Sequence, residues 1–201
     1  MKKRLFLLVS IFLVIYVNSA LTITYNSNPK IFIQELVDDA VKTLSDNSLS
    51  AEEKNNYIEK IATENVDINS LGLYTLGRIR KELDENTLNK YQDLFEKYFL
   101  KSLTSRLIDY SSQKFEVTDS EQKSSNYTIV KSRIAESLKS PEIKIDWRVY
   151  TKNPQKPLIR DLIVEGLSLA KTQKEEFASI LNSNNDDINS LIKKLQEFIV
   201  N

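Results

Sequence analysis

The sequence predicts an α+β fold, with helices packed around a twisted antiparallel sheet of about four strands. Apolar residues recur at three- and four-residue steps up to Tyr110 and again after Ser168, which is typical of helices. Between these two residues the apolar positions fall in short β-branched or aromatic runs, separated by polar or proline-containing turns. Because the strands are grouped and not interleaved with helices, an antiparallel meander is favoured over parallel βαβ units.

Four helices are predicted before the strands. Their apolar faces lie within residues 33–44, 57–62, 68–81 and 88–110. Asn28, ahead of a first-turn proline, caps the first helix, and Ser50 with Glu53 forms a capping box for the second. Asp84 or Asn86 caps the fourth helix, which carries a long aromatic stripe.

Four strands follow, at residues 114–118, 127–135, 143–151 and 158–164. The third strand alternates cleanly, so one of its faces is expected to be buried. The residues of that face are Ile143, Ile145, Trp147 and Val149. In the other strands apolar and polar residues alternate poorly, which favours strands that are covered by other elements on both faces. Ser168 and Asp186 are predicted to begin the last two helices.

The first residues have the features of a secretory signal peptide. Lys2, Lys3 and Arg4 precede an uncharged stretch over residues 5–17, and small residues end the segment at Ala20. A spanning helix needs about 20 apolar residues, so a cleaved signal is favoured over an uncleaved anchor. We expect residues 1–20 to be removed and residues 21–201 to form a single exported domain, since no repeat or linker divides them.

The composition excludes most familiar catalytic chemistry. The chain contains no Cys and no His, which removes disulfides, thiolate and imidazole metal sites and the Ser-His-Asp arrangement. Its 3 glycines are too scattered for a phosphate-binding loop. Removal of the signal peptide lowers the number of Lys and Arg residues from 28 to 25, against 28 Asp and Glu residues. This slightly acidic balance does not indicate nucleic-acid binding. We expect no enzyme activity, no cofactor, no metal and no nucleic-acid partner.

Two strings of residues carry a family resemblance. The first is Gly-Leu-Tyr-Thr-Leu-Gly-Arg at residues 72–78, ahead of the aromatic stripe. The second and more specific one joins Ile-Lys-Ile-Asp-Trp-Arg at 143–148 to Arg-Asp-Leu-Ile-Val-Glu-Gly-Leu-Ser-Leu at 160–169. With the order of elements, they resemble the MlaC family, also called the toluene-tolerance family, of periplasmic phospholipid-binding proteins. The resemblance covers nearly the whole chain after the signal.

The resemblance implies a periplasmic phospholipid carrier with an apolar pocket between sheet and helices. Its expected partners are an outer-membrane lipoprotein complex and an inner-membrane ABC transporter with an MCE-domain component, and the shuttling would maintain outer-membrane lipid asymmetry. A carrier needs no catalytic group, which agrees with the composition. The expected lipid-binding residues are Leu73, Leu76, Phe95, Phe99, Leu103, Leu107, Ile145 and Trp147. For each of them ordinary core packing is the alternative, because cores and pockets share one composition.

Other functions stay open at this stage. One is an exported interaction or assembly factor with the same fold and a filled core, another is a carrier of a different apolar ligand such as a hopanoid, and a third is an enzyme acting on lipid. Asp161, Glu165 and Ser168 would have to serve such an enzyme without a histidine, and a helix cap at Ser168 explains them better.

Four cations of the strands are candidates for a phosphate head group or an acidic partner, with a solvated sheet face as the favoured interpretation. They are Lys131, Arg133, Arg148 and Arg160.

Overall fold

The computed structural model describes residues 24–107, 114–136 and 141–200. The expected signal peptide lies outside the described residues. The helices are α1 (Pro29–Ser45), α2 (Ala51–Asn65), α3 (Ile68–Leu76), α4 (Glu85–Leu107), α5 (Leu169–Asn182) and α6 (Ile188–Val200), with a 3₁₀ turn η1 (Ile79–Lys81). The strands are β1 (Phe115–Ser124), β2 (Tyr127–Ile134), β3 (Ile143–Tyr150), β4 (Leu158–Val164) and β5 (Leu167–Ser168). None of these helices is long and apolar enough to cross a membrane.

The strands form one antiparallel sheet in the order β1-β2-β3-β4-β5, so the predicted α+β meander is confirmed. The sheet has five strands where four were expected, because β5 has only 2 residues and leaves no periodic signal. β1 continues to Ser124, beyond the predicted end at Thr118. Its second half is polar and exposed, so hydrophobic patterning does not reveal it.

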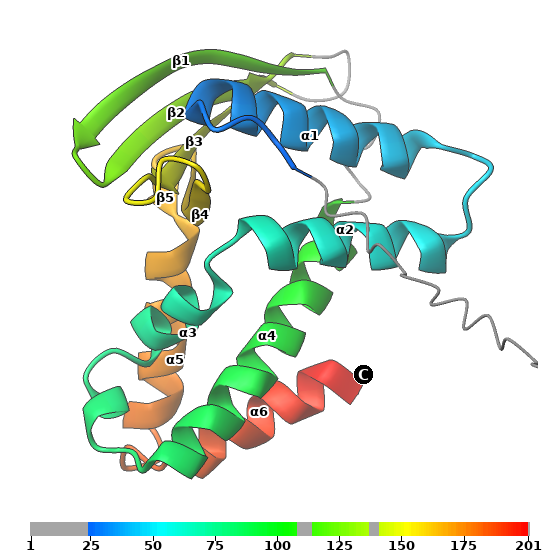
Figure 1. The fold of residues 1–201 in the computed structure, drawn as a ribbon. Coiled ribbons are helices and arrows are strands. Elements are labelled where there is room, and N and C mark those ends of the chain that lie inside the picture. Colours follow the sequence, from blue (N-terminus) through cyan, green and yellow to red (C-terminus); the bar gives the residue numbers. More distant parts are fainter. Residues whose placement is uncertain (1–23, 108–113, 137–140, 201) are drawn as a thin grey trace, which may run out of the picture.

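Figure 1 shows the sheet and α1 as an upper layer, with α3, α4, α5 and α6 below it. α1 lies on the inner face of the sheet, where its residues Phe32, Ile33 and Leu36 pack against the sheet residues Val130, Val149 and Ile159. Gln34 of α1 also accepts a hydrogen bond from the backbone N–H of Val117 at 3.2 Å, beside an irregularity of β1. The opposite face of the sheet is called here the outer face.

Burial along the strands differs from the sequence expectation. In β2 the residues Thr128, Val130, Ser132 and Ile134 are buried, and the residues between them are half-buried or exposed, so its cover is one-sided. On β3 the expected buried face exists, but only Val149 is fully buried. The prediction of cover on both faces was therefore wrong for β2, because α1 covers one face of the sheet and covers it only in part.

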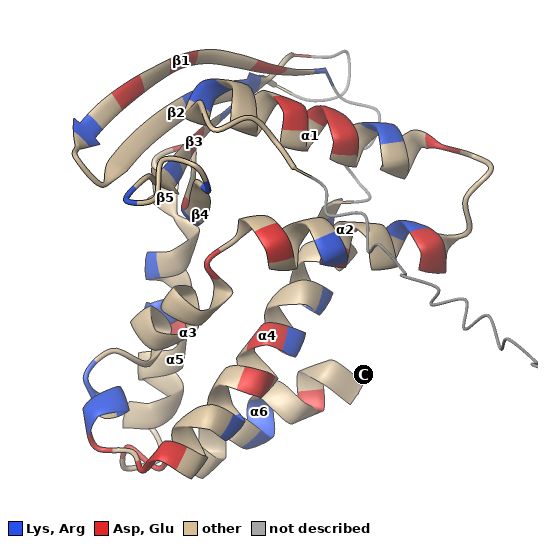
Figure 2. Cartoon of the chain, viewed as in Figure 1, with Lys and Arg blue, Asp and Glu red and all other residues tan. Residues whose placement is uncertain are grey.

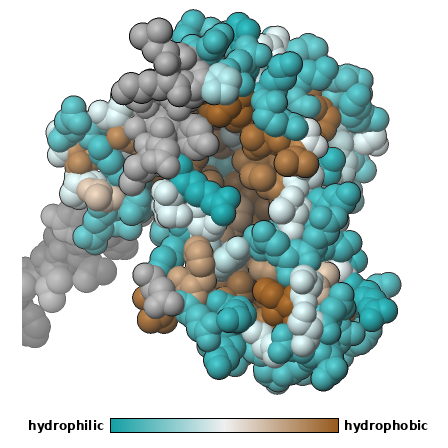
Figure 3. Space-filling view, turned by 180° about the vertical axis from the view of Figure 1, so that it is seen from behind, coloured by the Kyte–Doolittle hydropathy of each residue, from teal (hydrophilic) through white to brown (hydrophobic). Residues whose placement is uncertain are grey.

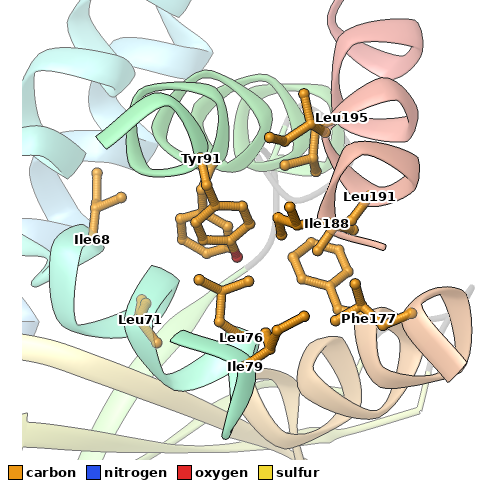
Figure 4. Close-up of a cluster of buried hydrophobic side chains, with 12 residues drawn as sticks. Ile68, Leu71, Leu76, Ile79, Tyr91, Phe177, Ile188, Leu191 and Leu195 are labelled. Atoms are coloured by element: carbon orange, nitrogen blue, oxygen red, sulfur yellow. The ribbon is translucent and has the colours of Figure 1, made fainter. Parts of the chain in front are cut away.

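The helices below the sheet have their own core, shown in Figure 4. Tyr91 of α4 points into the centre of this cluster, where Leu76, Phe177 and Leu191 surround it. Its hydroxyl shares a hydrogen bond of 2.8 Å with the hydroxyl of Thr75, so its polar atom is satisfied inside the core. A smaller cluster joins α1, α2 and the end of α4; its buried members are Leu44, Ile58 and Ile61.

The third predicted helix is interrupted. α3 ends at Leu76, and Gly77 follows it with a φ of 62°, which L residues rarely adopt. A single 3₁₀ turn then covers Ile79–Lys81. The prediction of one helix over residues 68–81 was therefore wrong, because the backbone at Gly77 is not helical and ends α3.

Candidate functional site

The register of the sheet identifies the residues on its inner face. Side chains of directly paired residues project to the same side of a sheet. Val130 pairs with Trp147, and Trp147 with Leu162. Ser132 pairs with Ile145, Ile145 with Val164, and Val164 with Leu167. These rows extend the face that α1 covers in part.

Beyond α1, the inner face is apolar and only half-buried. The half-buried apolar residues of this area are Ile143, Ile145, Trp147, Leu162 and Val164, called here the inner apolar face. Such a surface is normally covered by another element, since each of these side chains stabilises the fold only in proportion to the area it removes from water. The partial burial therefore indicates room between the sheet and the helices.

The helix contacts agree with such a space. α4 packs against α2, α3 and α6, whereas the sheet is contacted mainly by α1, α3 and α5. In the space-filling view from behind, apolar side chains gather in a hollow between the sheet layer and the helices (Figure 3). We call this hollow the groove, and we infer from the partial burial of the inner apolar face that this face is its sheet wall.

Trp147 presents a carbon surface in this wall. Its Nε1 donates to the hydroxyl of Ser132 at 2.8 Å, and that hydroxyl donates to the carbonyl of Ile145 at 2.9 Å. Phe115 meets the indole edge-on, with ring centroids 6.1 Å apart. Since the only polar atom of the indole is already bonded, the wall around Trp147 offers apolar contacts and no free donor.

Five of the eight predicted lipid-binding residues lie in two groups. Ile145 and Trp147 share the inner apolar face. Phe99, Leu103 and Leu107 form a half-exposed stripe along the second half of α4, at four-residue steps. Leu103 and Leu107 also pack against the cluster of α1 and α2, and Phe99 packs against the core of the helical layer.

The other three predicted residues lie elsewhere. Leu76 and Phe95 are buried in the core of the helical layer, each 3% exposed. Leu73 lines an open surface hollow of ≈ 440 Å³ between α3 and α4. A Cβ on Gly72 would lie 2.9 Å from the ring of Phe95, so the glycine permits the close approach of these two helices.

Sequence reasoning missed Leu162 and Val164, which lie on the same face as Ile145 and Trp147. Their strand does not alternate, because the pairing with β3 shifts by one residue between Arg148 and Val149. Only the register across the sheet shows that they belong to the inner apolar face.

The cations of the sheet do not line the inner face. Arg133 pairs with Glu116 and with Glu142 and stays exposed, as expected for a solvated face. Arg148 pairs with Asp161 at 3.3 Å. Figure 2 shows Lys and Arg interspersed with Asp and Glu along α1, α2 and α4, without a patch of one sign.

Arg160 departs from the expectation of a solvated face. It is half-buried, pairs with Asp67 at the start of α3, and lies over the ring of Tyr150. It therefore joins the sheet to the helical layer.

Lys131 and Arg148 border a hollow of ≈ 670 Å³ on the outer face of the sheet. Glu121 and Asp146 line the same hollow, and its apolar lining includes Ile129. With both signs of charge present, this hollow has no preference for an anion.

The carboxylate and hydroxyl considered for catalysis form a helix cap. Ser168 precedes α5, and its hydroxyl accepts a hydrogen bond from the backbone N–H of Lys171 at 3.0 Å. The same hydroxyl donates to Asp161 at 2.7 Å, and Asp161 accepts from the backbone N–H of Ala170 at 3.0 Å. Asp161 is 4% exposed. The expected cap at Ser168 is confirmed, with Asp161 as an additional, buried acceptor at the start of α5.

Comparisons with known proteins give a family and a fold. The family model described as MlaC protein matches residues 34–197. A solved structure of a phospholipid-binding protein from Ralstonia solanacearum, in complex with a phospholipid, is similar with a TM-score of 0.68 and 18% identity over 84% of this chain and 94% of that one. At this identity the similarity shows a common fold. A comparison with curated protein sequences gives no match.

Proposed function

The chain belongs to the MlaC family, and on that premise we propose that it is a periplasmic phospholipid carrier. Its acyl chains would occupy the groove between the sheet and the helices. The similar structure from Ralstonia solanacearum is that of a phospholipid-binding protein in complex with a phospholipid, which supports this choice of ligand.

The observation that carries the proposal is the half-buried inner apolar face. Its residues are only half-buried although all are apolar, and Figure 3 shows an apolar hollow between the sheet layer and the helices. The polar atom of Trp147 is bonded within the sheet, so the wall is suited to hydrocarbon. A carrier of this kind binds through apolar area alone, and we propose no catalytic step.

We propose that the lining has two walls. Ile145 and Trp147 belong to the sheet wall, and Phe99, Leu103 and Leu107 of α4 to the helical wall. The buried Leu76 and Phe95 back the helical wall, and Leu73 would touch only a chain that passes between α3 and α4.

The energetics favour transfer between docked partners. A two-tailed lipid has about 30 methylenes, and at about 0.8 kcal/mol for each the gross transfer energy from water is on the order of 20 kcal/mol. Release into water is therefore extremely slow. We propose that loading and unloading take place on an outer-membrane lipoprotein complex and on an inner-membrane ABC transporter with an MCE-domain component, which maintains lipid asymmetry.

Free shuttling requires that residues 1–20 be removed as a signal peptide. The intact mass of the protein isolated from the periplasm is expected to correspond to a chain beginning near residue 21. A full-length chain retained in the inner membrane would contradict the shuttle, even with a lipid in the groove.

The test of lipid binding uses two isoleucines on opposite faces of the sheet. Ile145 lies on the inner apolar face, and Ile163 pairs with Asp146 on the outer face; both are half-buried. Wild type, Ile145→Asn and Ile163→Asn are purified from the periplasm, extracted with organic solvent and analysed by mass spectrometry. Phospholipid is expected with wild type and Ile163→Asn, and much less with Ile145→Asn.

Wild-type protein without phospholipid would refute the carrier function and favour the interaction factor with a filled core. A hopanoid in the extract would keep the carrier and change its ligand. Equal lipid loss in both variants would show that the isoleucines act through stability and would remove the groove assignment.

A further inference from the structure

The turn between β4 and β5 exposes apolar side chains that the core does not use. Leu167 is 69% exposed and Leu169 is 43% exposed. Among the described large apolar residues, only Val200 at the end of α6 is more exposed than Leu167, at 85%. Two exposed leucines within three positions, outside any hydrophobic cluster of the described core, indicate a contact with an apolar ligand or another molecule.

Leu167 continues the groove wall. It pairs with Val164, and Val164 pairs with Ile145, so the three side chains form one row across β3, β4 and β5. Exposure rises along this row, from half-buried Ile145 and Val164 to the exposed Leu167. The inner apolar face therefore reaches solvent at Leu167, at the edge of the sheet.

The turn holds Leu167 in place. Glu165 and Gly166 have φ values of 49° and 82°, the two positive values that a type I′ hairpin turn requires. The backbone N–H of Glu165 also donates to the carbonyl of Lys144 at 3.0 Å, which ties the turn to β3. Leu167 is therefore held at the edge of the sheet by a tight turn and does not lie at the tip of a long loop.

We propose that Leu167 is the lip of the groove, the residue over which acyl chains pass when a phospholipid is taken up or released. This rests on the proposed phospholipid binding and adds the position of the opening. The occupant of the lip is the part of the acyl chain nearest the ester groups, because the chain ends extend further along the row toward Ile145 and toward Trp147 on the neighbouring row. The continuity of the row with the inner apolar face favours an acyl chain over a separate protein partner.

The composition of the chain permits a direct test. Trp147 is the only tryptophan, so its fluorescence reports on the sheet wall alone. The chain has no cysteine, so Leu167→Cys carries a single thiol for a bimane label, and Val200→Cys is the matched control at another exposed apolar position. Each labelled protein is loaded with phosphatidylglycerol bearing a nitroxide either near the ester end or near the methyl end of one acyl chain.

Bimane at position 167 is expected to lose more emission with the nitroxide near the ester end. Trp147 is expected to lose more with the nitroxide near the methyl end, and bimane at position 200 is expected to lose emission with neither. Circular dichroism of each variant checks that the fold is kept.

The outcomes separate the two proposals. Quenching of Trp147 without quenching at position 167 overturns the lip and leaves the carrier intact. Quenching at neither Trp147 nor position 167 overturns the carrier. Equal quenching of positions 167 and 200 indicates lipid adhering to the surface, and stronger quenching at 167 by the methyl-end nitroxide places the opening elsewhere; both overturn the lip.

Discussion

Replacing Arg160 with methionine is expected to loosen the junction between the sheet and the helical layer. Nε of Arg160 donates to Oδ2 of Asp67 at 2.7 Å, and Nη2 lies 2.7 Å from the same oxygen. Nη1 donates to the hydroxyl of Tyr127 at 3.0 Å, and the guanidinium lies over the ring of Tyr150, 3.4 Å from its centroid. Asp67 also caps α3 by accepting from the backbone N–H of Ser70 at 3.1 Å.

The magnitude follows from the burial of the pair. The side chain of Asp67 is 15% exposed and that of Arg160 is 26% exposed. Removing one partner of a fully buried pair costs about 3–5 kcal/mol, and partial exposure reduces this, so we expect Arg160→Met to lower the free energy of unfolding by about 2–3 kcal/mol. For a domain of this size that is a fall in melting temperature of about 4–12 °C.

A double-mutant cycle in urea separates the pair from other effects of the change. Asp67→Asn removes the charge and keeps a side chain that caps a helix well. We expect a coupling energy of about 1–2 kcal/mol between Arg160→Met and Asp67→Asn. A coupling energy near zero would contradict a stabilising ion pair, because the cost of Arg160→Met would then come from lost packing alone.

The pH dependence gives a second measure. Burial by itself raises the pKa of Asp67, but hydrogen bonds from Ser70 and Arg160 outweigh it and hold the pKa below its usual value. A carboxyl with a lowered pKa stabilises the fold above its ordinary pKa, and this contribution is lost as pH falls through the lowered value. The stability difference between wild type and Arg160→Met is therefore expected to shrink in acid, below about pH 4. A constant difference from pH 7 to pH 3 would contradict a role for the charge of Asp67.

Three further predictions concern other parts of the fold. Asp161→Asn is expected to lower the free energy of unfolding by about 2–3 kcal/mol, because it disturbs a buried acceptor at the start of α5. The control Asp146→Asn, on the outer face, should change the free energy of unfolding by less than about 0.5 kcal/mol, and urea denaturation measures both variants. Gly77→Ala is expected to cost about 1–2 kcal/mol in the same assay, because a φ of 62° with a ψ of −130° is a backbone conformation that residues with a Cβ rarely adopt; no loss would contradict this conformation at the end of α3. Burial raises the pKa of Tyr57 to about 12, and its hydrogen bond to Asp39 contributes to the same shift. The stability from this contact is therefore present below the ordinary tyrosine pKa and is lost as pH rises through about 12. In a ring-labelled NMR titration Asp39→Asn should lower that pKa, and an unchanged value would remove the role of Asp39.

Much of the fold was predictable because its signals are local. The capping box at Ser50 and Glu53 is present, and Asn28 and Ser168 cap their helices as predicted. Each of these depends on residues within one turn of a helix. The interruption at Gly77 was missed because the apolar spacing continues through it to Ile79, although a glycine near the end of a predicted helix is itself a termination signal.

The groove was predictable only in part. The alternation of β3 placed Ile145 and Trp147 on one face correctly, as the register confirms. Which of these apolar residues α1 covers, and which are left half-exposed, depends on contacts between residues more than 90 positions apart, such as Phe32 and Val130. Core residues and pocket residues have the same composition, so Phe95 and Phe99 could not be separated from their sequence.

The grouping of helices and strands, the helix caps and the absence of cysteine and histidine can all be read from the sequence, because they depend on neighbouring residues or on counts. The register of the sheet, in contrast, becomes visible only in the folded protein. The shifted pairing beside Val149 brings Leu162 and Val164 of β4 onto the inner apolar face, although their strand shows no alternation, and the pairing of β5 adds Leu167 to the row of Val164. Pairing across a sheet joins residues distant in the chain, and no local periodicity specifies it.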